Sequence, residues 1–120
     1  MEFILTEGAP KPAGHYSQAT VHGDLIFVAG QLSIDPTNGQ RMNGPIEEQT
    51  LQALKNLRAI LLAAGSDTSH VLKTTVFISD IELWGSVNKV YGEFFGDHKP
   101  ARSIVPTKEL HHGFLIEIEA

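Results

Sequence analysis

The fold is decided by the stretch from Pro45 to Ser79, PIEEQTLQALKNLRAILLAAGSDTSHVLKTTVFIS, in which helical spacing gives way to an extended pattern. Pro45 suits the start of a helix and Gly65 its end. Between them, apolar residues recur near helical spacing at Ile46, Leu51, Leu54, Leu57, Leu61 and Ala64. The segment Val71 to Ser79 is rich in β-branched residues, which favour strands. We therefore expect an amphipathic helix of about five turns followed by a strand.

The segments before this stretch predict further strands. Tyr16 to Val21 and Leu25 to Ala29 are rich in apolar and β-branched residues, and Gly23 between them suits a tight turn. We expect a β-hairpin here, with Phe3 to Leu5 as a candidate strand before it. Residues 33 to 45 are dense in turn formers and predict a surface loop.

The segments after the stretch predict a second helix and two more strands. Asp80 suits the N-cap of the helix, and Gly96 suits its end. Ser103 to Val105 predicts a short strand, and Phe114 to Glu119 predicts a strand with two different faces. In the latter, Leu115, Glu117 and Glu119 share one face, and Phe114, Ile116 and Ile118 share the other.

Together these elements predict a single α+β domain over residues 1–120, with two helices on one face of a mixed β-sheet. The uncovered face of the sheet needs a partner if it is apolar, so we expect a homo-oligomer. No apolar run approaches the roughly 20 residues of a membrane helix, and the N-terminus lacks the features of a signal peptide, which predicts a cytoplasmic protein with no membrane partner.

Composition excludes several classes of function. The chain has no cysteine, which excludes disulfides, thiolate metal sites and cysteine nucleophiles. A net charge of -5 with only nine Lys and Arg argues against nucleic acid as a partner. Adjacent residues of an extended segment point to opposite faces, so His111 and His112 do not predict a shared metal ion. No phosphate-binding glycine pattern is present, and we expect no cofactor.

Two charged residues could carry chemistry. Arg102 lies where a loop led by Pro100 enters a strand, and its guanidinium matches a carboxylate with two hydrogen bonds. A surface ion pair is the alternative role for Arg102. Glu117 lies in an apolar strand, where a carboxyl can have a raised pKa suited to activating water. Because Glu119 shares its face, a solvated acidic face is the alternative there.

Three further residues are candidates for binding. Tyr16 could close over a flat substrate, Asn88 on the second helix could bond to it, and Gly30 could bring backbone groups close to it. Each also has a purely structural alternative.

Read together, many short motifs resemble the Rid (YjgF-like) family over nearly the whole chain. They are residues 9–19 (APKPAGHYSQA), 25–31 (LIFVAGQ), 48–50 (EQT), 56–57 (NL), 63–65 (AAG), 73–77 (KTTVF), 87–88 (VN), Tyr91, 100–103 (PARS) and 116–119 (IEIE). The chain differs from the usual pattern at His15, Ala29 and Ile104, and over residues 106–113.

The resemblance implies a chorismate-mutase-like fold assembled as a homotrimer, with three sites in clefts between subunits. It implies hydrolysis of reactive enamines and imines from amino-acid metabolism, such as 2-aminoacrylate, 2-iminopropanoate and 2-iminobutanoate, to 2-keto acids and ammonia without a cofactor. By match to the family, Arg102 would clamp the substrate carboxylate, Glu117 would position water, and Tyr16, Gly30 and Asn88 would line or close the pocket. A ligand-binding or regulatory protein, an endoribonuclease and a chaperone-like protein are the alternatives.

Overall fold

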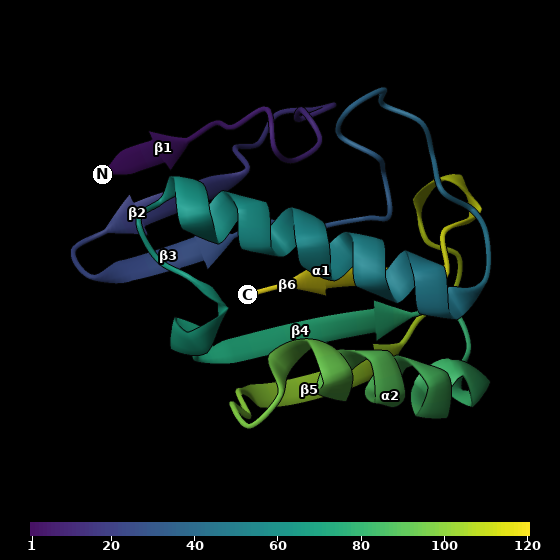
Figure 1. Ribbon diagram of the computed structural model, residues 1–120. Coiled ribbons are helices and arrows are strands. Elements are labelled where there is room, and N and C mark those ends of the chain that lie inside the picture. Colours follow the sequence, from purple (N-terminus) through teal and green to yellow (C-terminus); the bar gives the residue numbers. More distant parts are fainter.

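Six strands and two α-helices make up the computed structural model, which describes residues 1–120 (Figure 1). The strands are β1 (Glu2–Ile4), β2 (Ala19–His22), β3 (Leu25–Val28), β4 (Lys73–Ile78), β5 (Ala101–Pro106) and β6 (Ile116–Glu119). The helices are α1 (Ile46–Ala63) and α2 (Trp84–Phe95), and the short 3₁₀ helices are η1 (Thr68–His70), η2 (Ile81–Leu83) and η3 (His111–Gly113). The predicted α+β class is confirmed.

The strands form two three-stranded sheets where one mixed sheet was expected. The first has the antiparallel order β1-β2-β3, and the second has the order β5-β4-β6, in which β4 is parallel to β5 and antiparallel to β6. Backbone hydrogen bonds join β3 to β6, at the edge between the two sheets. Val28 pairs with Ala120 in both directions, at 2.7 and 3.4 Å, and Gln31 pairs with Ile118, at 2.7 and 3.1 Å.

A β-bulge explains why this junction is not a regular ladder. Between the two bonded pairs, Ala29 and Gly30 on one side face Glu119 alone on the other. Two residues opposite one is the definition of a bulge, which bends the strand and changes the direction of the side chains around it. Strand β3 therefore ends at Val28, one residue before its predicted end.

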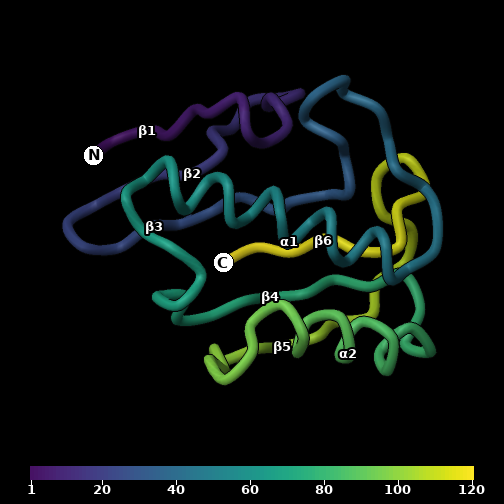
Figure 2. Tube along the Cα trace, viewed as in Figure 1, coloured from purple at the N-terminus to yellow at the C-terminus, as the bar shows by residue number.

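Both helices lie on the same side of the strands, as predicted, and they pack against each other (Figures 1 and 2). The core between the helices and the strands holds the fully buried side chains of Ala53, Leu54, Leu57, Ile60, Val76, Ile78, Val87, Ile116 and Ile118. Leu51 belongs to the predicted apolar repeat but is 39% exposed, and the helix turns Thr50 toward the core instead.

The helix ends follow the predicted signals with one difference. Helix α1 is preceded by Pro45, and Gly65 follows it in a left-handed conformation with φ 82°. Asp80 caps η2 rather than α2, because its carboxylate accepts a hydrogen bond of 2.8 Å from the backbone N–H of Glu82. Helix α2 starts after this extra turn and ends at Gly96, with φ 64°.

Two predicted strand limits are wrong in ways that affect the site. Strand β2 begins at Ala19, so Tyr16 lies in the preceding loop, because β1 pairs only as far as Ala19. Strand β5 runs from Ala101 to Pro106 because it pairs with β4 over its whole length, and Arg102 therefore lies inside a strand. Strands β4 and β6 are shorter than predicted.

The face of the sheets away from the helices is partly apolar. The pairing register places Phe3, Phe27, Phe77 and Val105 on this open face, since their neighbours in each strand point to the core. Phe3 is 68% exposed and Phe27 is 59% exposed. No helix of the chain is long and apolar enough to span a membrane.

Candidate functional site

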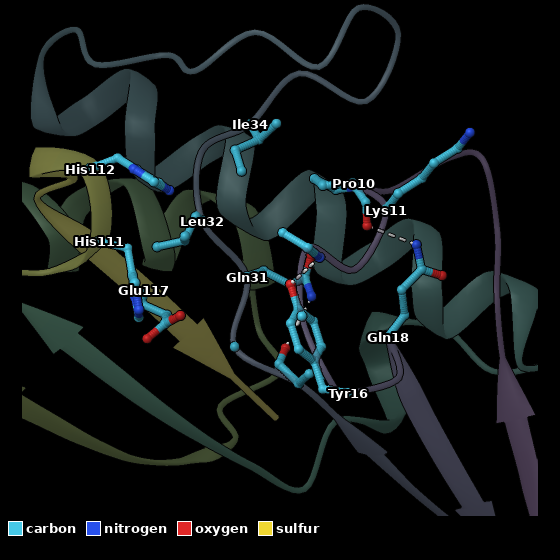
Figure 3. Close-up of a pocket in the computed structure, with 14 residues that line it drawn as sticks. Pro10, Lys11, Tyr16, Gln18, Gln31, Leu32, Ile34, His111, His112 and Glu117 are labelled. Atoms are coloured by element: carbon cyan, nitrogen blue, oxygen red, sulfur yellow. Dashed lines mark hydrogen bonds between the residues drawn. The ribbon is translucent and has the colours of Figure 1, made fainter.

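A cleft of about 480 Å³ opens where the two sheets meet (Figure 3). One wall is the loop from Pro10 to Gln18, the floor is the bulge and the segment that follows it, and the other wall is η3 with β6. Tyr16, Gly30 and Glu117 all line this cleft, although they are far apart in the sequence. The structure therefore brings together three of the five residues predicted for the site.

Glu117 presents a carboxylate that has no hydrogen-bond partner in the chain. Its neighbours Ile116 and Ile118 are fully buried, and Glu117 points to the opposite face of β6, as predicted. Burial raises the pKa of the Glu117 carboxyl, the nearby His111 lowers it in part, and the like charge of Glu119 raises it further. A carboxylate with these properties can hold and deprotonate a water molecule.

Gly30 makes room for that carboxylate. A Cβ atom at position 30 would lie 2.8 Å from both Cδ and Oε2 of Glu117, closer than carbon atoms normally approach. The backbone at Gly30 therefore lies directly against the carboxylate, and the bulge at Ala29 and Gly30 produces this approach.

Tyr16 is held on the opposite wall by its own loop. Its hydroxyl accepts a hydrogen bond of 3.1 Å from the backbone N–H of Ala13, and its side chain is more than half exposed. The loop is fixed by the buried side chain of Gln18, which bonds to the backbone of Thr6, Ala9 and Pro10. The Tyr16 ring is thus placed at the mouth of the cleft.

Arg102 and Asn88 lie outside this cleft. Arg102 pairs with Thr74 in the sheet, and Thr74 faces α2, where its hydroxyl is 2.7 Å from that of Tyr91. The Arg102 guanidinium carbon is 4.7 Å from the ring centre of Tyr91 and 5.6 Å from that of Trp84. Asn88 is exposed on α2, one turn from both rings.

The candidate residues thus fall into two groups on opposite faces of the sheets. Glu117 pairs with Phe77 on the open face, whereas Arg102 is on the helix face. Arg102 forms no salt bridge, so the alternative of a surface ion pair is not what the structure shows. Its guanidinium is stacked on aromatic rings with its N–H donors available to a ligand.

Several lining residues were not predicted. His111, His112 and Lys11 bring ionisable groups to the cleft. The sequence does not predict that the two histidines line this cleft, because nothing in it indicates that η3 folds back against β6. No three His, Asp or Glu side chains gather in a way that could hold a metal ion.

Comparison with known proteins gives the chain a family. The family model described as endoribonuclease L-PSP matches residues 6–120. A RutC family protein of Pyrococcus horikoshii is 49% identical over 119 residues, which cover 99% of this chain and 94% of that protein. The 2-iminobutanoate/2-iminopropanoate deaminase of Rattus norvegicus is 45% identical over 117 residues, covering 98% of this chain and 85% of the rat protein.

Solved structures agree with the sequence comparisons. The crystal structure of Escherichia coli TdcF with bound serine superposes with a TM-score of 0.95 at 34% identity, covering 100% of this chain and 96% of TdcF. The match covers the whole chain, and with it all six strands and both helices. The chain therefore belongs to the Rid family of YjgF-like proteins.

Proposed function

We propose that this protein hydrolyses small 2-imino acids to 2-keto acids and ammonia. The observation that carries the proposal is the Glu117 carboxylate, which lies unpartnered in a cleft against the backbone of Gly30. Such a group can take a proton from an attacking water molecule. The deaminase name of the rat relative and the serine bound to TdcF support a small ligand that carries an α-carboxylate.

The site is completed between two copies of the chain. Glu117 and Arg102 lie on opposite faces of one chain and cannot both contact a ligand of a few atoms there. The open face, with Phe3 and Phe27 exposed, gives a second copy an apolar surface to cover. We infer a homotrimer in which each cleft joins Tyr16, Gly30 and Glu117 of one subunit to Arg102 and Asn88 of the next.

Each residue then has a defined role in the cleft. Arg102 binds the substrate carboxylate with two charge-assisted hydrogen bonds, and stacking on Tyr91 keeps its guanidinium in place. Glu117 positions the water that attacks the imine carbon. Tyr16 and Asn88 close the cleft around the substrate, and Gly30 supplies backbone polar groups. Orientation and proton transfer are sufficient for this chemistry, since imines are reactive toward water.

The first test is release of keto acid and ammonia from freshly generated 2-iminopropanoate. We expect Arg102→Ala to lower kcat/KM about a hundredfold or more, because the lost carboxylate contact is worth roughly 3 kcal/mol. Arg58→Ala is a matched control, since Arg58 also stacks on an aromatic ring, at 5.3 Å from the centre of Phe94, but lies on α1.

Two results would contradict the proposal. Near-normal turnover by Arg102→Ala would exclude the carboxylate clamp. Binding of imino or amino acids by the intact protein with no acceleration of hydrolysis would indicate a ligand-binding or regulatory protein instead.

A further inference from the structure

The 3₁₀ helix η3 brings a second proton-carrying side chain into the cleft. His111 lies on the same wall as Glu117 (Figure 3), close enough for its charge to affect the ionisation of that carboxyl. The two side chains form no hydrogen bond with each other, and the His111 ring has no other hydrogen-bond partner in the chain. Both are therefore available to the same water molecule or ligand.

The conformation of η3 is held by the neighbouring histidine. His112 adopts a left-handed conformation with φ 56° and ψ 23°, the only non-glycine residue of the chain with positive φ. The side chain of Asn43 donates a hydrogen bond of 3.3 Å to the His112 carbonyl, and the His112 ring lies edge-on to buried Phe114, at 6.3 Å. Strained backbone of this kind persists where surrounding contacts impose it, often at functional sites.

We propose that His111 is a second acid–base group in the cleft, which passes a proton from Glu117 to the departing nitrogen of the substrate. This inference rests on the proposed imine hydrolysis. Glu117 is suited to receive the proton of water, but the amino group of the intermediate must itself gain a proton before it can leave. Histidine is the side chain that changes charge between pH 5 and 8, and His111 lies beside the proton that Glu117 receives.

The proposed reaction conserves atoms and charge. Water attacks the carbon of the iminium group, the C=N π pair moves to nitrogen, and Glu117 takes one water proton. His111, as the imidazolium, protonates the amino nitrogen and regains a proton from Glu117. The C–N bond breaks with its electron pair leaving on ammonia, and the hydroxyl proton passes to that ammonia as the C=O bond forms. The products are the 2-keto acid and ammonium, and both side chains return to their starting states.

The other ionisable groups around His111 are known from the structure. Glu117 and, beyond it, Glu119 lie on β6, His112 is adjacent on η3, and Lys11 and Tyr16 come from the opposite loop. Arg102 joins them from the neighbouring subunit in the proposed trimer. His111 and His112 are the only histidines among these groups. Substitution of His111 therefore shows whether this histidine takes part in the reaction.

The test compares pH–rate profiles of the wild-type protein, its His111→Gln variant and the control His70→Gln, with 2-iminopropanoate as substrate. His70 is on η1, outside the cleft. We expect His111→Gln to lower kcat on the order of a hundredfold with little change in KM and to change the shape of the pH–rate profile, whereas His70→Gln should leave both unchanged. Imidazole added to His111→Ala should restore part of the rate, which a purely structural role of His111 would not predict.

Thermal unfolding of each variant shows whether it is folded, and His111→Asn replaces any variant that is not. A pH–rate profile of His111→Gln that superposes on that of the wild type would overturn the proton-transfer role while leaving the proposed function intact. A wild-type protein that does not accelerate imine hydrolysis would overturn the proposed function, and this inference with it.

Discussion

Gly30 and Glu117 show how a glycine can determine the position of a reactive side chain. The carboxylate of Glu117 occupies the volume that a Cβ at position 30 would need. It makes no hydrogen bond that would hold it elsewhere, so steric space and burial determine its position. The same burial raises the pKa of the Glu117 carboxyl and makes it a better base.

Gly30→Ala should therefore damage activity more than stability. The added methyl group displaces the flexible end of Glu117, and we expect turnover to fall at least about tenfold, since misplacement of about 1 Å costs catalysis heavily. Gly92→Ala is the matched control, because no atom lies within 4 Å of the Cβ it would add on α2. Steady-state kinetics with thermal unfolding of both variants checks this, and equal activity of the two would contradict it.

Glu117→Gln should stabilise the fold at neutral pH. Burial raises the pKa of Glu117 in the folded chain above its value in the unfolded chain, which is about 4.3. The stabilisation that Glu117 gives the folded state is therefore fully present below the unfolded-state pKa and is lost as pH rises through the folded-state pKa. Glutamine resembles the protonated carboxyl at every pH. The Tm of Glu117→Gln should exceed that of the wild type at pH 7, and the difference in Tm should shrink as pH falls toward about 4.

Melting curves at several pH values test this, with Glu93→Gln on the exposed side of α2 as the control. A difference in Tm between Glu117→Gln and wild type that does not change with pH would show that the Glu117 carboxyl is not destabilised by burial.

At the scale of elements, the sequence predicts the helices well and the site only in part. Helix α1 was found from Pro45, Gly65 and the apolar repeat, because those signals are local. The two faces of β6 could also be predicted, because the side chains of a strand point alternately to opposite faces and this pattern is local. The limits of β2 and β5 were missed, because they depend on how far a distant partner strand extends.

The cleft itself depends on long-range contacts that no local pattern encodes. The bulge at Ala29 and Gly30 exists only where β3 meets β6, and the fold of η3 depends on a left-handed His112, a conformation that is uncommon for residues other than glycine. Gln18 likewise lies inside the predicted strand Tyr16 to Val21, and nothing in the sequence indicates that its side chain bonds to the preceding loop. The residues of the site could be proposed from the sequence by resemblance. The sequence does not show that they lie on two opposite faces of the sheets, because this depends on the pairing of distant strands.

Gln18→Ala should unfold the loop that carries Tyr16. The Gln18 amide accepts a hydrogen bond of 2.7 Å from the N–H of Thr6 and donates to the carbonyls of Thr6 and Pro10, at 3.0 and 2.9 Å. Loss of these buried bonds should cost about 2 to 4 kcal/mol, which corresponds to a fall in Tm of roughly 10 °C. Calorimetry compared with Gln40→Ala, in an exposed turn, tests this; similar Tm values would contradict it.

For the whole molecule, the decisive feature is that the two groups of site residues lie on opposite faces. If each cleft takes Glu117 from one subunit and Arg102 from the next, two inactive variants can complement each other. Arg102→Ala and Glu117→Gln, unfolded together in equal amounts and refolded, should recover about a quarter of wild-type activity, because a quarter of the clefts in random closed trimers receive both intact residues.

Refolding each variant alone is the control for complementation, and activity is read as keto-acid release. Mixed samples that remain as inactive as the separate variants would indicate that Glu117 and Arg102 act within one chain or do not act together.

The bulge between β3 and β6 also affects which changes in chain length this fold can accept. Removing one of the two bulge residues would leave a single residue opposite Glu119, and the ladder would run without interruption from Val28 to Gln31. Both bonded pairs would keep their register, so the side chains before and after the bulge would keep their faces. The bend that sets the Gly30 backbone against the Glu117 carboxylate would be lost. A deletion of one residue here should therefore preserve the fold and change the shape of the cleft.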